Sequence, residues 1–306
     1  MRQAKKKTVY DIITQEVIKK LESVNPSDFK KPWFNIGLSP YNAISKKKYR
    51  GINYITLGNN DHTLKAYASF KQWKNKGCMV KKGEKSHCAI FWKIGKYEDA
   101  KTSEEKTSFL LRYYSVFNAE QVEGDYARDI ESKAIKELKE HNPIPIAQLL
   151  VENYVANERI PLIEGDRAYY SQSVIGASEK ISMPKLGQFK DAESFYSTFF
   201  HEMGHSTGNE TRLKRDLSNG FGSKGYAKEE LIAELTAAML SGSIGLTQKP
   251  RLDHAQYIAS WLQALKNDNK FVVQAAGQAQ KAADYIEKSA EHYQQWKDNG
   301  VLMAAE

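Results

Sequence analysis

The chain has 306 residues, a net charge of +8 and two cysteines, Cys78 and Cys88. This length allows two domains that each bury a core. No run approaches about 18 consecutive apolar residues, which excludes a membrane-spanning helix, and two cysteines cannot build a disulfide framework. Because the basic N-terminus also lacks the apolar segment of a secretory signal, we expect a cytoplasmic protein with reduced thiols and no membrane partner.

The charge is divided unevenly along the chain. Residues 1–97 hold 21 Lys and Arg against 6 Asp and Glu, a balance of +15, whereas residues 98–306 hold 24 against 31, a balance of −7. Such an asymmetry indicates separate tasks for the two parts. The basic part suits a polyanion, and nucleic acid is favoured over an anionic membrane because the cations are spread over loops rather than along one helix.

In the first part, apolar residues at three- and four-residue steps predict a helix over residues 8–23. A stretch rich in turn residues follows. Strands are expected around Val80 and over residues 89–92 and 110–117. The polar residues 96–108 are expected to form an exposed loop between two of these strands.

The second part begins beyond a boundary region at residues 126–145, which is charged and ends with an Asn-Pro-Ile-Pro sequence that predicts an extended break. The elements expected after it are a helix over 146–157, short strands at 167–171 and 180–183, and helices over 191–207, 226–244 and, as a pair, 253–298. The predicted class is α+β: a small mixed α/β domain over residues 1–125, a linker region, and a mostly helical domain with a short sheet over residues 146–306.

The segment DAESFYSTFFHEMGHSTG contains a metal-binding pattern. Asp191 can cap a helix and Gly208 can end it. On that helix His201 and His205 are four residues apart, so both imidazoles project from one face and can bind one ion. Glu202, beside them, can accept a proton from a water at the metal. A pair of core or solvated histidines is the alternative.

The following helix, in YAKEELIAELTAAML, carries Glu230 and Glu234 at the same spacing beside small alanines that allow two helices to approach closely. A catalytic zinc site uses three protein ligands. We predict Glu230, in preference to Glu229, as the third ligand and Glu234 as the carboxylate that orients a ligand histidine. A solvated acidic helix face is the alternative.

Two further points concern this predicted site. The sequence HEMGHSTGNET follows the metzincin pattern HExxHxxGxxH up to its last position, where Thr211 replaces the third histidine. The expected cofactor is therefore one divalent metal held by two histidines and a glutamate, Zn²⁺ in the first place, with Mn²⁺ or another ion as alternatives. We hypothesise that Glu202 passes its proton to the leaving amine of a peptide, with Tyr169, Tyr170 or Tyr226 assisting at the carbonyl oxygen.

The basic part interleaves lysines with aromatic residues, and glycines occur at its turns. A cationic groove with aromatic platforms suits single strands, because each unpaired base can stack at about 1–3 kcal/mol. The alternative is that the aromatics form a core and the lysines are merely solvated. The residues expected to contact DNA are Lys48, Tyr49, Arg50, Asn53, Lys71, Trp73, Lys81, Lys82, Lys85 and Trp92.

Several motifs along the chain resemble one family. The stretches KYRGINYITL, FKQWKNKGCMVKKGEKSHCAIFW and RYYSVFNAEQVEG look like the N-terminal, single-stranded-DNA-binding domain of ArdC-type antirestriction proteins. Further on, AYY, ISMP, FYSTFFHEMGHSTG, RLKRDL and YAKEELIAEL resemble the zincin-like metallopeptidase domain of that family. The resemblance implies metal ligands at His201, His205 and Glu230, a catalytic role for Glu202, and a YRGIN motif at residues 49–53.

The same resemblance implies a protein of plasmids or phages that protects incoming DNA from host restriction. Its expected partners are single-stranded DNA and either a protein substrate or the host restriction machinery. Two other functions fit the same layout. One is a DNA-binding protection factor whose metal site is structural or vestigial, and the other is a repair protease that digests proteins attached to DNA.

Overall fold

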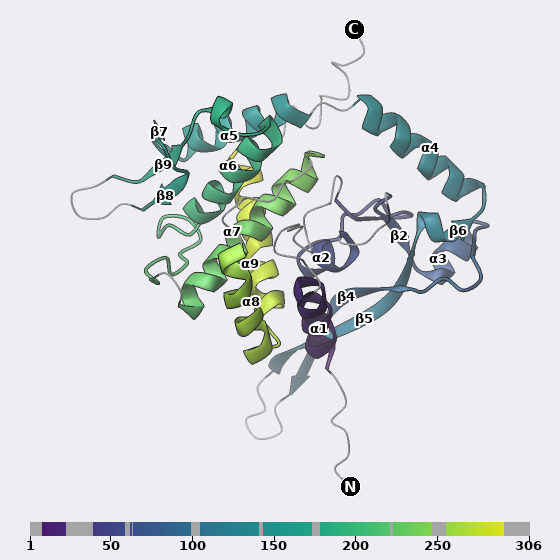
Figure 1. The fold of residues 1–306 in the computed structure, drawn as a ribbon. Helices are drawn as coiled ribbons and strands as arrows, with labels where there is room; N and C mark the ends of the chain where they lie inside the picture. Colours follow the sequence, from purple (N-terminus) through teal and green to yellow (C-terminus); the bar gives the residue numbers. More distant parts are fainter. Residues whose placement is uncertain are drawn as a thin grey trace. The chain divides into compact units, whose positions relative to one another are not determined.

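The computed structural model describes residues 8–22, 39–58, 62, 64–98, 105–140, 143–172, 178–220, 223–246 and 255–290. The chain divides into two compact units, residues 1–16 with 40–139 and residues 17–39 with 140–306. Short sheets and helices occur in both (Figure 1), which confirms the predicted α+β class. None of the described helices is both long and apolar enough to cross a membrane.

The first helix, α1 (Val9–Glu22), contains the division between the units. The elements that follow it are β1 (Tyr41–Asn42), α2 (Ile52–Gly58), β2 (Ala66–Ala68), α3 (Phe70–Asn75), β3 (Met79–Val80), β4 (His87–Glu98), β5 (Glu105–Asn118), the 3-10 helix η2 (Ala119–Gln121), β6 (Val122–Glu123) and α4 (Asp125–Glu140). The main sheet has the strand order β1-β2-β5-β4, and β3 pairs with β6 in a small second sheet.

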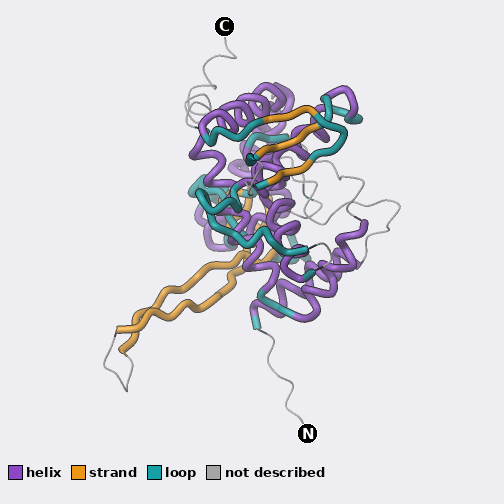
Figure 2. The backbone as a smooth tube through the Cα atoms, turned by 90° about the vertical axis from the view of Figure 1, so that its left-hand side faces the viewer, coloured by secondary structure: helices purple, strands orange, loops and turns teal. Residues whose placement is uncertain are grey.

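The strands β4 and β5 form a long antiparallel ribbon (Figure 2). Their register runs from His87 opposite Val116 to Glu98 opposite Glu105. The expectation of a loop over residues 96–108 is therefore wrong, because only residues 99–104 lie between the strands. A polar composition does not prevent pairing, since strand propensity depends mainly on the neighbours available across the ladder.

The core of the N-terminal unit is built around Trp73 of α3, whose side chain is completely buried. Its indole N–H donates to the carbonyl oxygen of Phe117 over 3.0 Å. Helix α3 begins with a capping box in which Ser69 and Gln72 each bind the other's backbone N–H. The periodicity used above did not identify α2 and α3, because both helices are shorter than two full turns of the apolar pattern.

The elements of the C-terminal unit are α5 (Pro143–Asn157), β7 (Leu162–Glu164), β8 (Tyr169–Ser171), β9 (Lys180–Met183), the 3-10 helix η3 (Leu186–Gln188), α6 (Ala192–Ser206), α7 (Lys224–Ser243), α8 (Ala255–Asn267) and α9 (Phe271–Ser289). Helix α5 starts at Pro143, so the extended break expected there is wrong. Prolines are tolerated in the first helical turn, where the N–H groups have no partner inside the helix.

The helices α6 and α7 have clear ends and a close contact. The Asp191 carboxylate accepts from the backbone N–H of Ser194 at the start of α6, and the Ser223 hydroxyl accepts from that of Tyr226 at the start of α7. Between the helices, a Cβ atom added to Gly204 would lie 3.1 Å from the Cα of Ala233. The small residues therefore bring the two backbones together, as the alanine-rich sequence of α7 predicts.

Candidate metal centre

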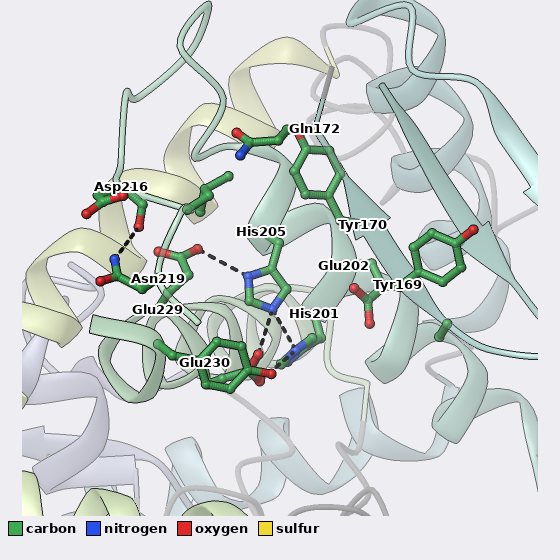
Figure 3. Close-up of a pocket in the computed structure, with 13 residues that line it drawn as sticks. Tyr169, Tyr170, Gln172, His201, Glu202, His205, Asp216, Asn219, Glu229 and Glu230 are labelled. Carbon is green, nitrogen blue, oxygen red and sulfur yellow. Dashed lines mark hydrogen bonds and ion pairs between the residues drawn. The ribbon is translucent and has the colours of Figure 1, made fainter. Parts of the chain in front are cut away.

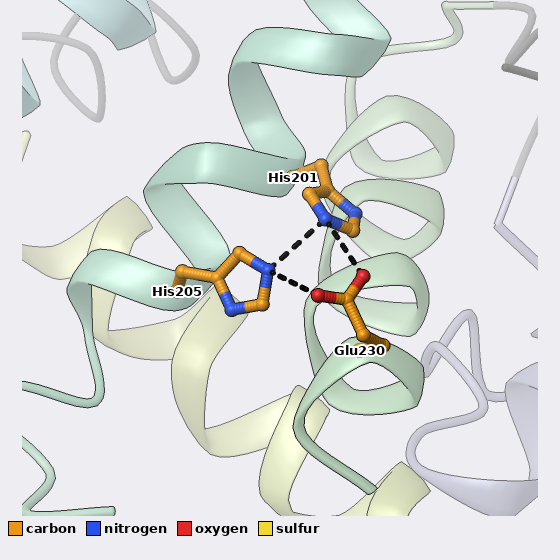
Figure 4. A group of neighbouring side chains, drawn as sticks. All are labelled: His201, His205 and Glu230. Carbon is orange, nitrogen blue, oxygen red and sulfur yellow. Dashed lines mark hydrogen bonds and ion pairs between the residues drawn. The ribbon is translucent and has the colours of Figure 1, made fainter. Parts of the chain in front are cut away.

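Three side chains from α6 and α7 converge on one point (Figure 4). The Nε2 atoms of His201 and His205 lie 3.1 Å apart. Each carboxylate oxygen of Glu230 faces one of them, Oε2 at 3.5 Å from His201 Nε2 and Oε1 at 3.5 Å from His205 Nε2. The structure thus brings together the three residues that the sequence predicts as ligands.

This arrangement fits a divalent metal. Two bonds of about 2.0–2.1 Å at a tetrahedral angle separate the donor atoms by about 3.3 Å, close to the spacings among His201, His205 and Glu230. The ligand side chains are largely buried, with exposed fractions of 5%, 14% and 10%. Two imidazoles and a carboxylate are also the donor set of a catalytic zinc site, which keeps a further position open.

The far nitrogen of each histidine faces a second carboxylate. Glu234 Oε1 lies 2.9 Å from His201 Nδ1, at a side-chain exposure of 3%, which is the position that the sequence predicts for it. Glu229 Oε1 lies 3.2 Å from His205 Nδ1. A carboxylate there holds the proton on Nδ1 and directs the Nε2 lone pair to the metal. Glu229, considered above only as a rival ligand, thus supports the second histidine.

Sequence reasoning missed the residue behind Glu229. The Arg215 guanidinium donates to both oxygens of Glu229 over 2.8–2.9 Å. It also donates to the carbonyl oxygen of Gly204, near the C-terminal end of α6, where a cation is favoured by the helix dipole. The signal in the sequence is the RLKRDL motif, but nothing in its spacing shows where the Arg215 side chain reaches.

The histidines and glutamates of the metal centre shift one another's pKa values, because their opposite charges attract. Burial alone lowers the pKa of His205, but Glu229 and Glu230 outweigh this effect and raise it to about 10. Burial alone raises the pKa of Glu230, and its contacts with His201 and His205 outweigh this and hold it well below the usual range. Because metal ligands must be deprotonated, metal binding at neutral pH has to displace a proton from this cluster.

A pocket of about 330 Å³ opens onto the two histidines and Glu230 (Figure 3). Glu202 lines it beside His201, although its side chain is mostly buried. Tyr169, Tyr170 and Tyr226 line it as well. The pocket is therefore lined by the three predicted ligands, by Glu202 and by the three tyrosines, whereas Glu234 lies behind His201 and is not part of the lining.

Of these three tyrosines, Tyr170 has a hydroxyl group that binds two other side chains. Tyr170 donates to Glu179 over 2.8 Å and accepts from Asn209. Glu179 in turn binds Arg212, whose Nη1 also donates to the carbonyl oxygen of Ser206 at the end of α6. The Tyr170 hydroxyl is thus part of the scaffold that holds α6.

The structure corrects part of the expected DNA-binding set. Trp73 is completely buried and Tyr49 is 8% exposed, so neither presents a ring face on which a base can stack. The Asn53 side chain binds the backbone N–H and carbonyl of Ile90 over 2.7 and 2.6 Å, and so joins α2 to β4. The Trp92 side chain lies outside the part that the structure describes. Trp73 and Tyr49 were misassigned because the sequence pattern of lysines and aromatic residues is the same whether the rings are buried or exposed.

The remaining expected contacts are exposed cations. Six side chains of this kind lie on the surface of the N-terminal unit: Lys48, Arg50, Lys71, Lys81, Lys82 and Lys85. Three aromatic side chains among the described residues of the same unit are also exposed, and none of them was in the set expected to contact DNA. They are Phe70 (48%), Phe91 (44%) and Tyr113 (56%).

Comparison with known proteins agrees with this layout. Residues 150–278 match the zincin-like metallopeptidase family MPTase-PolyVal, and residues 7–117 match the N-terminal domain of the anti-restriction factor ArdC. The chain thus belongs to the class of proteins in which an ArdC N-terminal domain is followed in sequence by a zincin-like domain.

Solved structures specify the family further. The metal-free crystal structure of the antirestriction protein ArdC from plasmid R388 is 30% identical, with a TM-score of 0.73 over 94% of this chain and 99% of that one. The chain belongs to the ArdC antirestriction family. The Mn(II)-bound structure of the R388 protein is 29% identical, with a TM-score of 0.68. Together with the zincin-like fold and the His201, His205 and Glu230 group, it points to a divalent metal.

Relatives known from sequence differ in length. The y4eC protein of Sinorhizobium fredii is 34% identical over an alignment of 296 residues. The match covers 91% of this chain and 91% of the y4eC chain. A DNA primase TraC of Escherichia coli is 32% identical over 301 residues, but this chain spans only 20% of its length. A sequence similar to this chain thus makes up most of one relative and a fifth of a much longer one.

Proposed function

We propose that the protein binds single-stranded DNA through its N-terminal unit and hydrolyses peptide bonds at the metal centre, and that it thereby protects incoming DNA from host restriction. The observation that carries the catalytic part is the convergence of His201, His205 and Glu230, with Glu202 lining the same pocket. Membership of the antirestriction family supports the biological role.

In this proposal, Glu202 moves the proton. When bound, a divalent metal such as Zn²⁺ or Mn²⁺ supplies Lewis-acid polarisation of the substrate carbonyl and lowers the pKa of a water. The Glu202 carboxylate accepts the proton of the attacking water and delivers it to the amine that leaves. Glu229 and Glu234 keep the two histidines in the tautomer and orientation that the site requires.

The charge of the pocket supports a polypeptide as the substrate rather than a nucleic acid strand. Its lining includes the carboxylates of Glu202, Asp216, Glu229 and Glu230, and none of the described lining residues is a lysine or an arginine. A phosphodiester backbone would meet these carboxylates with no lysine or arginine among the described lining residues to bind it, whereas protein sites for nucleic acid rely on Lys and Arg. Peptide hydrolysis avoids this repulsion.

For DNA binding, the exposed cations of the N-terminal unit support a single-stranded ligand. Lys71 follows the exposed Phe70 on α3, and Phe91 pairs with Arg112 across the β4–β5 ribbon, where both side chains are exposed. Neighbouring cations and exposed rings are what a sequence-tolerant single-strand site uses. We therefore assign stacking to Phe70, Phe91 and Tyr113 in place of Trp73.

The test of the proposed function is the variant Glu202→Gln. It has nearly the same volume and keeps both histidines and Glu230, so it should retain metal while losing proton transfer. We expect peptidase activity to fall by about 10²–10⁴-fold, and protection of unmodified plasmid DNA during transfer into a restricting host to fall with it. Metal content and binding of a labelled single strand should equal those of the wild type.

The other outcomes separate the competing functions. Full protection by Glu202→Gln, with metal still bound, would indicate a DNA-binding protection factor whose metal centre is structural. Cleavage of proteins crosslinked to DNA, stimulated by single strands and without any effect on transfer, would indicate a repair protease.

A further inference from the structure

A second pair of histidines lies in the N-terminal unit, outside the metal centre described above. His62 precedes β2 and His87 begins β4, and their Nε2 atoms are 3.1 Å apart with the rings at 80° to each other. His62 Nδ1 lies 3.1 Å from Glu120 Oε2. The His62 and Glu120 side chains are 22% and 31% exposed, so small solutes can reach them.

This cluster is held in place by its surroundings. The second oxygen of Glu120 accepts from the backbone N–H of Leu64 over 2.6 Å, and Asn118 binds the carbonyl oxygen of Leu64 over 2.6 Å. The ring of His87 contacts the buried Tyr67 at 5.6 Å between centroids. His62 and Leu64 are thus both bound to Glu120 of η2, and the two imidazoles are positioned before any ligand arrives.

The arrangement of the two rings resembles that of the histidine pair in the metal centre (Figure 4). There, too, two Nε2 atoms lie 3.1 Å apart, the rings make an angle of 83°, and carboxylates face the far nitrogens. Glu120 holds a proton on His62 Nδ1 and so leaves the lone pair of Nε2 directed at His87. Two Nε2 atoms at this distance share either a proton or a metal ion, and a metal ion that binds there takes the place of the proton.

We propose that His62 and His87 form a second metal site, which binds a transition-metal ion of the kind that prefers imidazole, such as Zn²⁺, Co²⁺, Ni²⁺ or Cu²⁺. With two protein ligands it is weaker than the His201, His205 and Glu230 centre, and its other positions are taken by water or by an external donor. Mg²⁺ and Ca²⁺ are not expected to bind, because they prefer oxygen ligands.

The test is a titration of the full-length, chelator-stripped protein with Co²⁺ at pH 7.5, followed by visible absorption and by metal analysis after equilibrium dialysis. The wild type should take up about two ions per chain, and His87→Gln and His205→Gln about one each, the first retaining the tighter site and the second the weaker one. The double variant should take up none. Uptake of a single ion by the wild type, or unchanged uptake by His87→Gln, would overturn the proposal.

A second pair of variants avoids altering either ligand. Glu120→Gln removes the carboxylate behind His62 and should weaken the second site by about 10–100-fold, with the tighter site unchanged. Glu123→Gln, an exposed residue of β6 in the same unit, should leave both affinities unchanged. Equal affinities of Glu120→Gln and Glu123→Gln for the second ion would contradict the role of Glu120 in holding His62 for a metal.

Discussion

Arg215 is a single residue on which the metal centre and the end of α6 both depend. Its side chain is 7% exposed and pairs with the buried carboxylate of Glu229. Replacing Arg215 by Met leaves that carboxylate without its guanidinium, and breaking a buried pair in this way costs about 3–5 kcal/mol. We expect the free energy of unfolding of the metal-free protein to fall by this amount, as measured by urea denaturation.

The same variant should also bind metal about 10–100-fold more weakly, because Glu229 no longer has a fixed position behind His205. The matched control is Lys185→Met. Lys185 is 67% exposed and pairs with the exposed Glu164, so its loss should change stability by less than about 1 kcal/mol. If Arg215→Met bound metal as tightly as Lys185→Met, the supporting role of Glu229 would be disproved.

Some residues of the metal centre could be predicted from the sequence and others could not. His201, Glu202, His205 and Glu230 could be predicted, because the four-residue step of a helix places side chains on one face and the chemistry of zinc requires a third ligand. Arg215 could not, because it extends from a loop, where no periodicity relates position in sequence to position in space.

Among the elements, the contact of α6 with α7 sets the distance from Glu230 to the histidines. A Cβ on Gly204 would meet the Ala233 backbone at 3.1 and 3.2 Å and the Thr236 Cβ at 3.3 Å. Gly204→Val should therefore push the helices apart, at a cost of about 1–3 kcal/mol for overpacking. We expect a measurable loss of metal affinity in an equilibrium titration.

The control for that variant is Gly277→Val in α9, where an added Cβ would meet no atom within 4 Å. Both changes place a β-branched residue in a helix, so differences between them report the contact with α7 and not helix propensity. Equal metal affinities of the two variants would contradict the spacing role of Gly204.

Helix α3 provides a second prediction at this scale. Trp73→Phe removes an indole that donates to Phe117 from a fully buried position. Because the side chain packs in the core, the midpoint of thermal unfolding should fall, whereas affinity for a labelled single strand, measured below that temperature, should stay within about twofold of wild type. Phe70→Ala, by contrast, should weaken binding with little effect on stability, since base stacking contributes about 1–3 kcal/mol.

The elements themselves were predicted unequally. The helices expected over 191–207 and 226–244 agree with α6 and α7 within about two residues, because both carry capping residues and are long. The β4–β5 ribbon was cut short in the prediction, since polar residues near a turn give no alternation to distinguish a strand from a loop.

For the whole molecule, the positive charge in the first 97 residues should make DNA binding sensitive to salt. Replacing Lys71, Lys82 and Lys85 together by Gln removes three exposed cations. If all three contact phosphates of a single strand, the slope of log K against log salt should become shallower by about 2. Fluorescence anisotropy of a labelled strand across a salt series measures this slope.

The matched control replaces Lys185, Lys190 and Lys224 together by Gln, because these exposed lysines belong to the C-terminal unit. It changes the net charge of the protein by the same amount. Equal slopes for the two triple variants would mean that strand binding depends on total charge and not on the basic N-terminal surface.

All three carboxylates around the two histidines come from one helix, α7. Glu230 lies between the two histidines, Glu234 lies behind His201 and Glu229 lies behind His205, so all three positions are fixed by the rotation of one helix. One extra residue inside α7 between Glu230 and Glu234 turns the carboxylates on either side of it out of phase by about 100°. The donor set around the metal therefore depends on the rotational phase of α7.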